Sequence, residues 1–325
     1  MGGLPLNKFL VILNERVMKK FLIKEVDLVR KSTKDCIIDI NIALAIDENY
    51  ITPSGVLLFS ILENNKSSNI HFHIFTTCCE LDKFKEFKEF KTNITIYFLN
   101  EDYFSSLQTP GHFTSAIYYR IAIPSILQNR IKNVLYIDAD VLCVGSLEAF
   151  NQIDIFDYYI AAVEDLGMTR EDVMALGISG KYFNSGVMFI NIEKWVNENI
   201  FEKFMVLIND RIFKYPDQDA LNILFKNKVL YISSSFNHYK EKNSCQANLI
   251  HYVGWLKPWS MAADNNEKYL EYYRKSPFNE IPLQNPNTYK LAKMLAKKYK
   301  INKRYSDYVK WYFIYIFMKT KYKFK

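Results

Sequence analysis

The sequence predicts an α/β protein with a mostly parallel sheet flanked by helices. The chain has 325 residues, of which 49% are hydrophobic and 24% are charged, which is the composition of a folded globular protein. Between residues 37 and 137, short apolar strands alternate with helical patterns. Such alternation is typical of parallel strands joined by helices that cover both faces of a sheet. Only 10 residues are glycine and no GxGxxG or GxxxxGK[ST] segment occurs, so no glycine-rich phosphate loop is expected.

The expected elements follow from the hydrophobic patterns. Runs of apolar, often β-branched residues predict strands at 37–46, 70–76, 94–99, 134–137, 186–192 and 229–232. Amphipathic patterns predict helices at 53–64, 79–91, 115–129, 195–209 and 218–225. At the first of these helices, Thr52 can cap the N-terminus and Pro53 fits the first turn.

The pattern divides the chain into three parts. Residues 1–35 are expected to form a charged, helical N-terminal extension, and residues 36–263 the α/β domain that carries the site. From residue 264 the composition shifts towards Lys, Tyr and Phe. Residues 264–325 are therefore expected to form a basic, aromatic helical extension. It either packs on its own domain or contacts the acceptor or a membrane surface.

Charge and cysteine content bound the partners and the compartment. The net charge of +7 favours an anionic partner such as a sugar phosphate, an anionic lipid or nucleic acid. The five cysteines show no CxxC spacing, which indicates reduced thiols in a cytoplasmic protein. No stretch reaches the roughly 20 apolar residues that a spanning helix needs.

Two acidic residues follow the expected strand at 134–137. Asp138 and Asp140 are separated by one small residue, and parallel sheets bind ligands at the carboxyl ends of their strands. Two carboxylates in this arrangement suit Mg²⁺ or Mn²⁺. Alone, the DxD pattern is also explained by a turn in which the carboxylates accept backbone hydrogen bonds.

Three further segments carry polar groups at expected strand or helix boundaries. The segment 251–259 offers the His251 imidazole as a third metal ligand, Gly254 for close backbone approach and Lys257 to neutralise a diphosphate. The segment 182–186 places small polar residues before a buried strand, which suits binding of a sugar. Acids open the helix that begins near Asp217, where capping and the helix dipole explain at least one of them.

Together these segments resemble the retaining glycosyltransferases of family 8, which include bacterial lipopolysaccharide galactosyl- and glucosyltransferases and glycogenin. The resemblance covers roughly residues 37–260 and rests on five segments in the family's order and spacing. They are AIDENY (45–50), YIDADV (136–141), YFNSGV (182–187), PDQDALN (216–222) and HYVGWLKPW (251–259). The C-terminal segment looks like the extension of the lipopolysaccharide core enzymes.

The resemblance implies a GT-A-like fold and a role for each matching residue. It implies that Ala45 and Asp47 hold the uracil, Asn49 the ribose, and that Tyr50 stacks on the base. The metal ligands would be Asp138, Asp140 and His251, with Asp138 also near the ribose. Gly254 and Lys257 would contact the diphosphate. The residues implied around the donor sugar are Arg120, Asp165, Asn184, Ser185, Asp217 and Gln218. Ser185 and Glu48 depart from the family, which often has Ala and Asp at these positions.

The implied activity is retaining transfer of a hexose from UDP-glucose or UDP-galactose to a lipopolysaccharide core acceptor, assisted by Mn²⁺ or Mg²⁺. Gln218, with Asp165 and Asp217, is expected nearest the reacting carbon. The protein is expected in the cytoplasm, peripheral at the inner membrane, without nucleic acid as a partner. A nucleotidyltransferase, a glycogenin-like enzyme and a basic nucleic-acid-binding module are the alternatives. The sequence leaves the donor sugar, linkage, metal and oligomeric state open.

Overall fold

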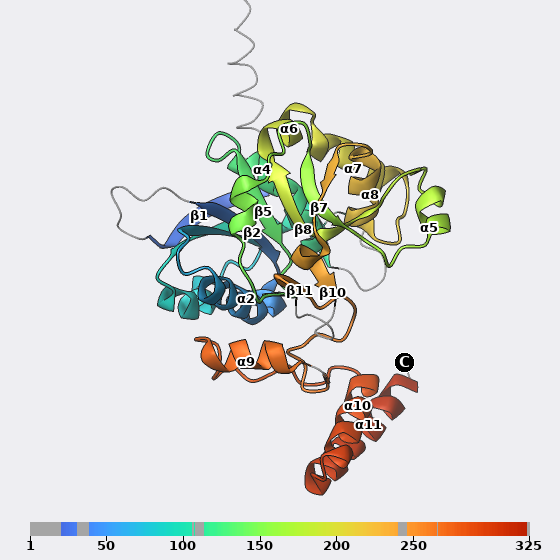
Figure 1. The fold of residues 1–325 in the computed structure, drawn as a ribbon. Helices are drawn as coiled ribbons and strands as arrows, with labels where there is room; N and C mark the ends of the chain where they lie inside the picture. The colour runs from blue at the N-terminus through green and yellow to red at the C-terminus, as the bar shows by residue number, and fades with distance from the viewer. Residues whose placement is uncertain are drawn as a thin grey trace, which may run out of the picture.

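The computed structural model describes residues 21–30, 39–105, 107, 114–239, 246–264 and 266–323. Its centre is an eight-stranded sheet in the order β1-β4-β3-β2-β5-β8-β7-β9 (Figure 1). The strands are β1 (Leu22–Val29), β2 (Ile40–Ile46), β3 (Ile70–Thr76), β4 (Asn93–Leu99), β5 (Asn133–Ile137), β7 (Ile160–Glu164), β8 (Phe183–Asn191) and β9 (Val229–Tyr231).

The middle of this sheet is parallel. Strands β4, β3, β2 and β5 run in the same direction, whereas β8 is antiparallel to both β5 and β7. The strand β9 is parallel to β7. The predicted α/β class is therefore confirmed, with the parallel strands at the centre and antiparallel pairings towards both edges.

Helices cover both faces of the sheet because successive side chains of its strands point to opposite sides. On β2, Ile42 and Leu44 join one hydrophobic cluster, together with α2 (Ile51–Asn64). Ala43 joins the other cluster, which contains side chains of five further helices. These are α3 (Glu101–Ser105), α4 (Tyr119–Leu127), α6 (Ile192–Asn197), α7 (Ile200–Asp210) and α8 (Pro216–Leu224). Figure 1 shows α2 below the sheet and α4, α6, α7 and α8 above it.

The expected helical N-terminal extension is wrong for residues 22–29, which form the strand β1. This strand pairs antiparallel with β4, and Val26 lies opposite Ile96. Leu, Lys and Glu favour helices locally, but pairing along β4 satisfies the backbone groups of β1 and overrides that weak preference. Residues 1–20 and 31–35, the rest of the extension apart from Phe21 and Arg30, lie outside the described part of the chain.

Three other helix predictions change in detail. The amphipathic segment 79–91 contains a 3₁₀ helix, η2 (Leu81–Glu89), that still buries Phe84 and Phe87. The segment 195–209 contains the break between α6 and α7, because Asn199 adopts a left-handed conformation with φ of 50°. The segment 115–129 begins with the 3₁₀ turn η3 (Ser115–Tyr118). The described residues also contain the 3₁₀ turns η1 (Glu48–Tyr50), η4 (Glu148–Gln152) and η5 (Ser234–Asn237).

A second, smaller sheet lies beside the end of β5 and was not expected from the sequence. It contains β6 (Val141–Cys143), β11 (Leu249–His251) and β10 (His238–Tyr239). The strand β11 is antiparallel to β6, with His251 opposite Val141. This pairing joins segments that are more than 100 positions apart in the sequence, and it fixes one side of the site described below.

Three helices form the C-terminal part of the chain: α9 (Glu267–Lys275), α10 (Tyr289–Ile301) and α11 (Tyr305–Lys323). The helix α9 packs on α2, where Asn64 Nδ2 donates to the Tyr272 hydroxyl at 2.8 Å. The helices α10 and α11 lie against each other around a small cluster that includes Leu295 and Trp311. Within the described residues, no helix combines the length and the apolar character needed to span a bilayer.

Candidate active site

The two acidic residues of the DxD pattern lie at the carboxyl end of β5, as the sequence predicts. The Asp138 N–H donates to the Gly186 carbonyl at 2.8 Å. Because β8 runs antiparallel to β5, with Val187 opposite Ile137, the beginning of β8 lies beside the end of β5. The polar residues before and within the start of β8 therefore meet the acidic pair at one edge of the sheet.

The pairing of β11 with β6 brings His251 to the same place. The Tyr252 N–H donates to the Asp140 carbonyl at 3.0 Å, directly after His251. One ligand atom each from Asp138, Asp140 and His251 can be chosen so that all three lie within 4.8 Å of one another. The structure thus gathers the three residues that the sequence indicated as metal ligands.

The packing around these three side chains fits a bound divalent cation. A Cβ atom at Gly186 would lie 2.3 Å from His251 Cε1 and 2.9 Å from Asp138 Oδ2, so only glycine lets the imidazole and the carboxylate converge here. Two carboxylates and one imidazole form a donor set that Mn²⁺ and Mg²⁺ both accept.

Asp140 is surrounded by cationic or hydrogen-bonding groups. Its Oδ2 lies 2.5 Å from Lys257 Nζ and its Oδ1 lies 3.2 Å from His251 Nε2. Burial alone raises the pKa of this carboxyl, but attraction to His251 and Lys257 outweighs burial and holds the pKa below its ordinary value. Burial raises the pKa of Asp138, and attraction to Arg120 offsets only part of that effect. The pKa values of the two carboxyls are thus shifted in opposite directions, upward for Asp138 and downward for Asp140.

Arg120 connects the acidic pair to the polar residues of α8. Arg120 is 7% exposed, with NH2 2.8 Å from Asp138 Oδ1 and NH1 3.1 Å from Asp217 Oδ2. NH1 also donates to the Ser185 carbonyl at 3.1 Å. The Ser185 hydroxyl in turn donates to Asp217 Oδ2 at 3.0 Å. One buried cation therefore holds two carboxylates from different elements.

Gln218 is the centre of the neighbouring hydrogen bonds. Its Oε1 accepts from Asn184 Nδ2 and from the Ser185 N–H, both at 3.0 Å. Its Nε2 donates to Asp165 Oδ2 at 3.1 Å. Asp165 follows the end of β7, so the Gln218 amide is held between β7 and β8 with both of its ends engaged. Such contacts leave the side chain little rotational freedom.

Asn237, which no sequence motif singles out, connects these contacts to His251, so that they run around the candidate metal site from Asp138 to Asp140. Its Nδ2 donates to Asn184 Oδ1 at 2.8 Å, so its Oδ1 faces His251 Nδ1 at 2.9 Å. With a cation bound between the acidic residues, the imidazole would carry its proton on Nδ1 and direct the Nε2 lone pair towards that cation. We call the resulting set the polar ring. Its members are Arg120, Asp138, Asp140, Asn184, Ser185, Asp217, Gln218, Asn237 and His251.

We expect Asn237→Ala to weaken Mn²⁺ binding by about 10- to 100-fold, the range typical of lost partners of metal-ligating histidines. The alanine removes the acceptor that orients the His251 ring, while the three ligand groups themselves remain. Calorimetric titration with Mn²⁺ measures the affinity directly. Asn151→Ala, at an exposed position, is the matched control. Equal Mn²⁺ affinity in wild type and Asn237→Ala would show that the ring orientation does not depend on Asn237.

The residues expected around a nucleotide lie at the end of β2, beside the polar ring. Asp47 caps η1 by accepting from the Asn49 N–H at 2.9 Å, and Ala45 lies two residues earlier. Tyr50 meets Trp259 edge to face, with ring centroids 5.4 Å apart. Gly254 has a φ of 97°, which favours glycine. Tyr50 thus contacts the 251–259 segment through its ring. Within the described part of the chain, no hydrogen bond joins Ala45, Asp47, Asn49 or Tyr50 to the polar ring.

Several known proteins are similar to this chain. The profile of glycosyl transferase family 8 matches residues 41–263. The lipopolysaccharide glucosyltransferase WaaO of Escherichia coli K12 is 32% identical over 307 residues, which are 85% of this chain and 90% of that protein. The lipopolysaccharide 1,3-galactosyltransferase of Salmonella typhimurium is 30% identical over 302 residues, with the same two coverages of 85% and 90%. The galactosyltransferase LgtC, solved with donor and acceptor sugar analogues, matches with a TM-score of 0.67 at 25% identity, over 73% of this chain and 96% of that chain.

Proposed function

The chain belongs to glycosyltransferase family 8, and from this premise we propose that it transfers glucose or galactose from the UDP-sugar to a lipopolysaccharide core acceptor with retention of configuration. The two lipopolysaccharide enzymes are similar to this chain over 90% of their own length. That coverage favours the lipopolysaccharide acceptor over a glycogenin-like self-transfer.

The observation that carries the proposal is the polar ring. It joins a candidate metal triad of Asp138, Asp140 and His251 to the amides of Gln218 and Asn184 through continuous hydrogen bonds. A metal-assisted sugar transfer needs these two kinds of group side by side, one for the diphosphate and one for the hexose. The ring supplies both at one edge of the sheet.

The family assigns the donor contacts along this edge. Ala45, Asp47, Asn49 and Tyr50 would bind uridine at the end of β2, and Gly254 would approach the diphosphate with its backbone. Lys257 would neutralise a phosphate. Its ammonium group now pairs with Asp140, and a bound cation would compete for that carboxylate and free Lys257 for the diphosphate.

Asp138, Asp140 and His251 would hold Mn²⁺ or Mg²⁺. When bound, the cation neutralises negative charge on the departing diphosphate. Lys257 adds a second positive charge beside the same group. Arg120 keeps Asp138 and Asp217 apart and fixed, so the acidic groups are already arranged before the donor binds.

In the proposed reaction the bond between the anomeric carbon and the phosphate oxygen breaks, and the acceptor hydroxyl oxygen bonds to that carbon from the same face. The hydroxyl proton moves to an oxygen of the leaving UDP. Gln218 lies on the other side of the hexose and stabilises the positive charge that develops on the ring, since an amide is a poor nucleophile. Its hydrogen bonds to Asn184 and Asp165 hold it for this task.

Release of UDP tests the proposed function. Wild-type protein is incubated with UDP-glucose and with UDP-galactose, each with Mn²⁺, with Mg²⁺ and with EDTA. Release that requires a metal and prefers one donor identifies the reaction and the sugar. Absence of UDP release from both donors with both metals would overturn the assignment.

We expect Gln218→Ala to lower kcat by about 100-fold, in the range observed for removing one group that stabilises transition-state charge. The donor KM should change little because Lys257 and the uridine contacts remain. Steady-state UDP release measures both constants. Gln152→Ala, at an exposed position, serves as the control. Near-full turnover in Gln218→Ala would remove this residue from the mechanism.

The enzyme is proposed to work at the cytoplasmic face of the inner membrane through α11. One side of this helix exposes apolar side chains at helical spacing, namely Tyr305, Val309, Tyr312, Phe313, Ile316 and Phe317. Phe313 and Phe317 are 67% and 69% exposed, while Trp311 and Tyr315 face α10. An exposed apolar stripe with neighbouring lysines is typical of a helix that lies in the membrane interface.

Vesicle binding tests this role of α11. Phe313→Ser/Phe317→Ser keeps the buried contacts of α11 with α10, and it should bind phosphatidylglycerol vesicles at least about tenfold more weakly than wild type. Phe156→Ser/Ile212→Ser changes two exposed apolar residues elsewhere and is the matched control. Sedimentation with vesicles gives the bound fraction. Equal binding by wild type and the α11 variant would exclude the stripe as the attachment site.

A further inference from the structure

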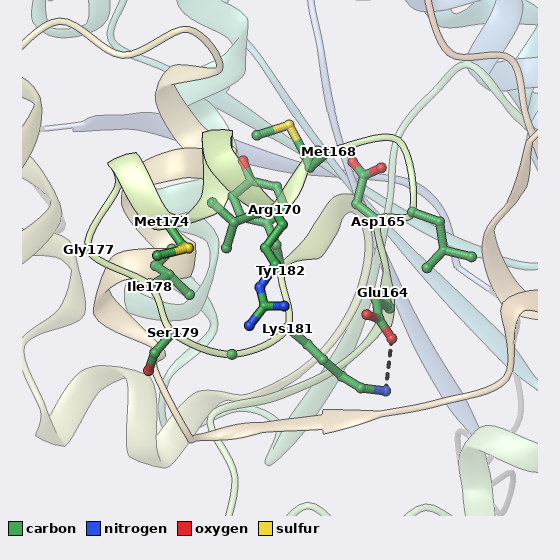
Figure 2. A pocket seen from close by; sticks show the side chains of 13 residues that line it. Glu164, Asp165, Met168, Arg170, Met174, Gly177, Ile178, Ser179, Lys181 and Tyr182 are labelled. Atoms are coloured by element: carbon green, nitrogen blue, oxygen red, sulfur yellow. Dashed lines mark ion pairs between the residues drawn. The ribbon is translucent and has the colours of Figure 1, made fainter.

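The connection between β7 and β8 encloses a pocket that has no assigned role. Residues 164–182, which include α5 (Arg170–Ala175), surround a cavity of about 560 Å³ (Figure 2). This volume lies in the range of small-molecule binding sites.

Packing and hydrogen bonds hold the walls of the pocket in place. Val173, Ile178 and Tyr182 form a small buried cluster beneath the connection. The Thr169 side chain caps α5 by accepting from the Asp172 N–H at 3.1 Å. The Tyr182 hydroxyl donates to Asp219 Oδ1 at 2.5 Å, which ties the connection to α8. The pocket therefore keeps its shape through contacts with the main domain.

The pocket shares one residue with the contacts of Gln218. Asp165 lines the cavity, and its Oδ2 accepts from Gln218 Nε2 at 3.1 Å. Asp165 Oδ1 accepts from the Gly167 N–H at 2.9 Å, which fixes the carboxylate at the entrance of the connection. A molecule in the pocket consequently lies next to the place where the proposed function puts the hexose.

The two cationic side chains that line the pocket differ in their ion pairing. Lys181 Nζ lies 2.8 Å from Glu164 Oε2, so this cation is already paired. Arg170 reaches into the pocket (Figure 2) and has no ion-pair partner in the described part of the chain. Its planar guanidinium offers a fork of N–H donors that matches a phosphate or a carboxylate. Met168 and Met174 supply the apolar surface on which the C–H face of a sugar can rest.

We propose that this pocket binds a sugar unit of the acceptor that carries an anionic group, and that Arg170 pairs with that group. The proposal rests on the proposed function, since the position of the acceptor follows from the donor site beside Asp165. It adds a requirement that the transfer reaction itself does not contain: an acceptor with a phosphate or a carboxylate near the reacting hydroxyl.

Equilibrium binding tests the proposal without catalysis. The probe is a deacylated lipopolysaccharide core oligosaccharide, used intact, after phosphatase treatment, and after chemical reduction of its carboxyl groups. Calorimetry should give a Kd about tenfold or more higher for Arg170→Gln than for wild type with the intact probe. Arg170→Lys should fall between the two, because it keeps the charge but loses the fork. Arg274→Gln, at an exposed position of α9, is the control and should match wild type.

The treated probes identify the anionic group. Whichever treatment removes that group should weaken binding to wild type and abolish the difference between wild type and Arg170→Gln. Equal Kd values for wild type and Arg170→Gln with the intact probe, or no binding of that probe to wild type, would overturn the proposal. UDP release by wild type is measured separately, so failure of this inference is distinguishable from failure of the proposed function.

Discussion

Replacing Asp140 with alanine is expected to lower metal-dependent UDP release by about 1,000-fold, or roughly 4 kcal/mol of transition-state stabilisation. Asp140 contacts Lys257 at 2.5 Å and His251 at 3.2 Å. The substitution removes one of two carboxylate ligands from the candidate metal site, and it leaves Lys257 without its buried partner. UDP release from the preferred donor with saturating Mn²⁺ measures the effect.

The matched control is Asp157→Ala, which removes an exposed acid elsewhere on the surface and should retain wild-type activity. Calorimetric titration with Mn²⁺ separates the two consequences of the change at Asp140, because a lost ligand lowers metal affinity whereas a displaced Lys257 does not. Circular dichroism verifies that both variants are folded. Wild-type rates in Asp140→Ala would exclude the acidic pair from the reaction.

Arg120→Met is expected to destabilise the fold by about 3–5 kcal/mol, the range for breaking a buried ion pair by removing one partner. The guanidinium pairs with Asp138 and Asp217 and donates to the Ser185 carbonyl. Methionine preserves much of the volume and leaves two mutually repelling carboxylates without their cation. Urea-induced unfolding without added metal gives the free energy of unfolding.

Arg130→Met is the comparison for this experiment. Arg130 pairs with Glu25 at 2.8 Å, but both side chains are about 40% exposed, so the loss should stay below about 1 kcal/mol. Added Mn²⁺ should recover part of the stability of Arg120→Met, since the cation replaces positive charge beside Asp138. An equally small effect at both arginines would show that Asp138 and Asp217 do not depend on Arg120.

Local pattern accounts for the central strands and for the position of the acidic pair. The apolar runs that became β2, β3, β4 and β5 are each bounded by polar or turn-forming residues, so their type can be read without knowing their neighbours. Local pattern fails at β1, where residues 22–29 favour a helix by composition but pair with β4. It also fails at β6 and β11, short strands that form through pairing with each other across more than 100 positions of the sequence.

The sequence by itself determined the α/β class, the acidic pair after β5 and, through the spacing of five segments, the family. Only the tertiary structure decided how these segments meet. The pairing of β11 with β6 places His251 beside Asp140, and the absence of a side chain at Gly186 lets it approach. Asn237 and Arg170 belong to no motif. Asn237 matters because it lies within hydrogen-bond distance of His251, and Arg170 matters because it lines the pocket between β7 and β8. Hydrogen bonds and ion pairs act over a few ångströms in space, whereas a pattern records only separation along the chain.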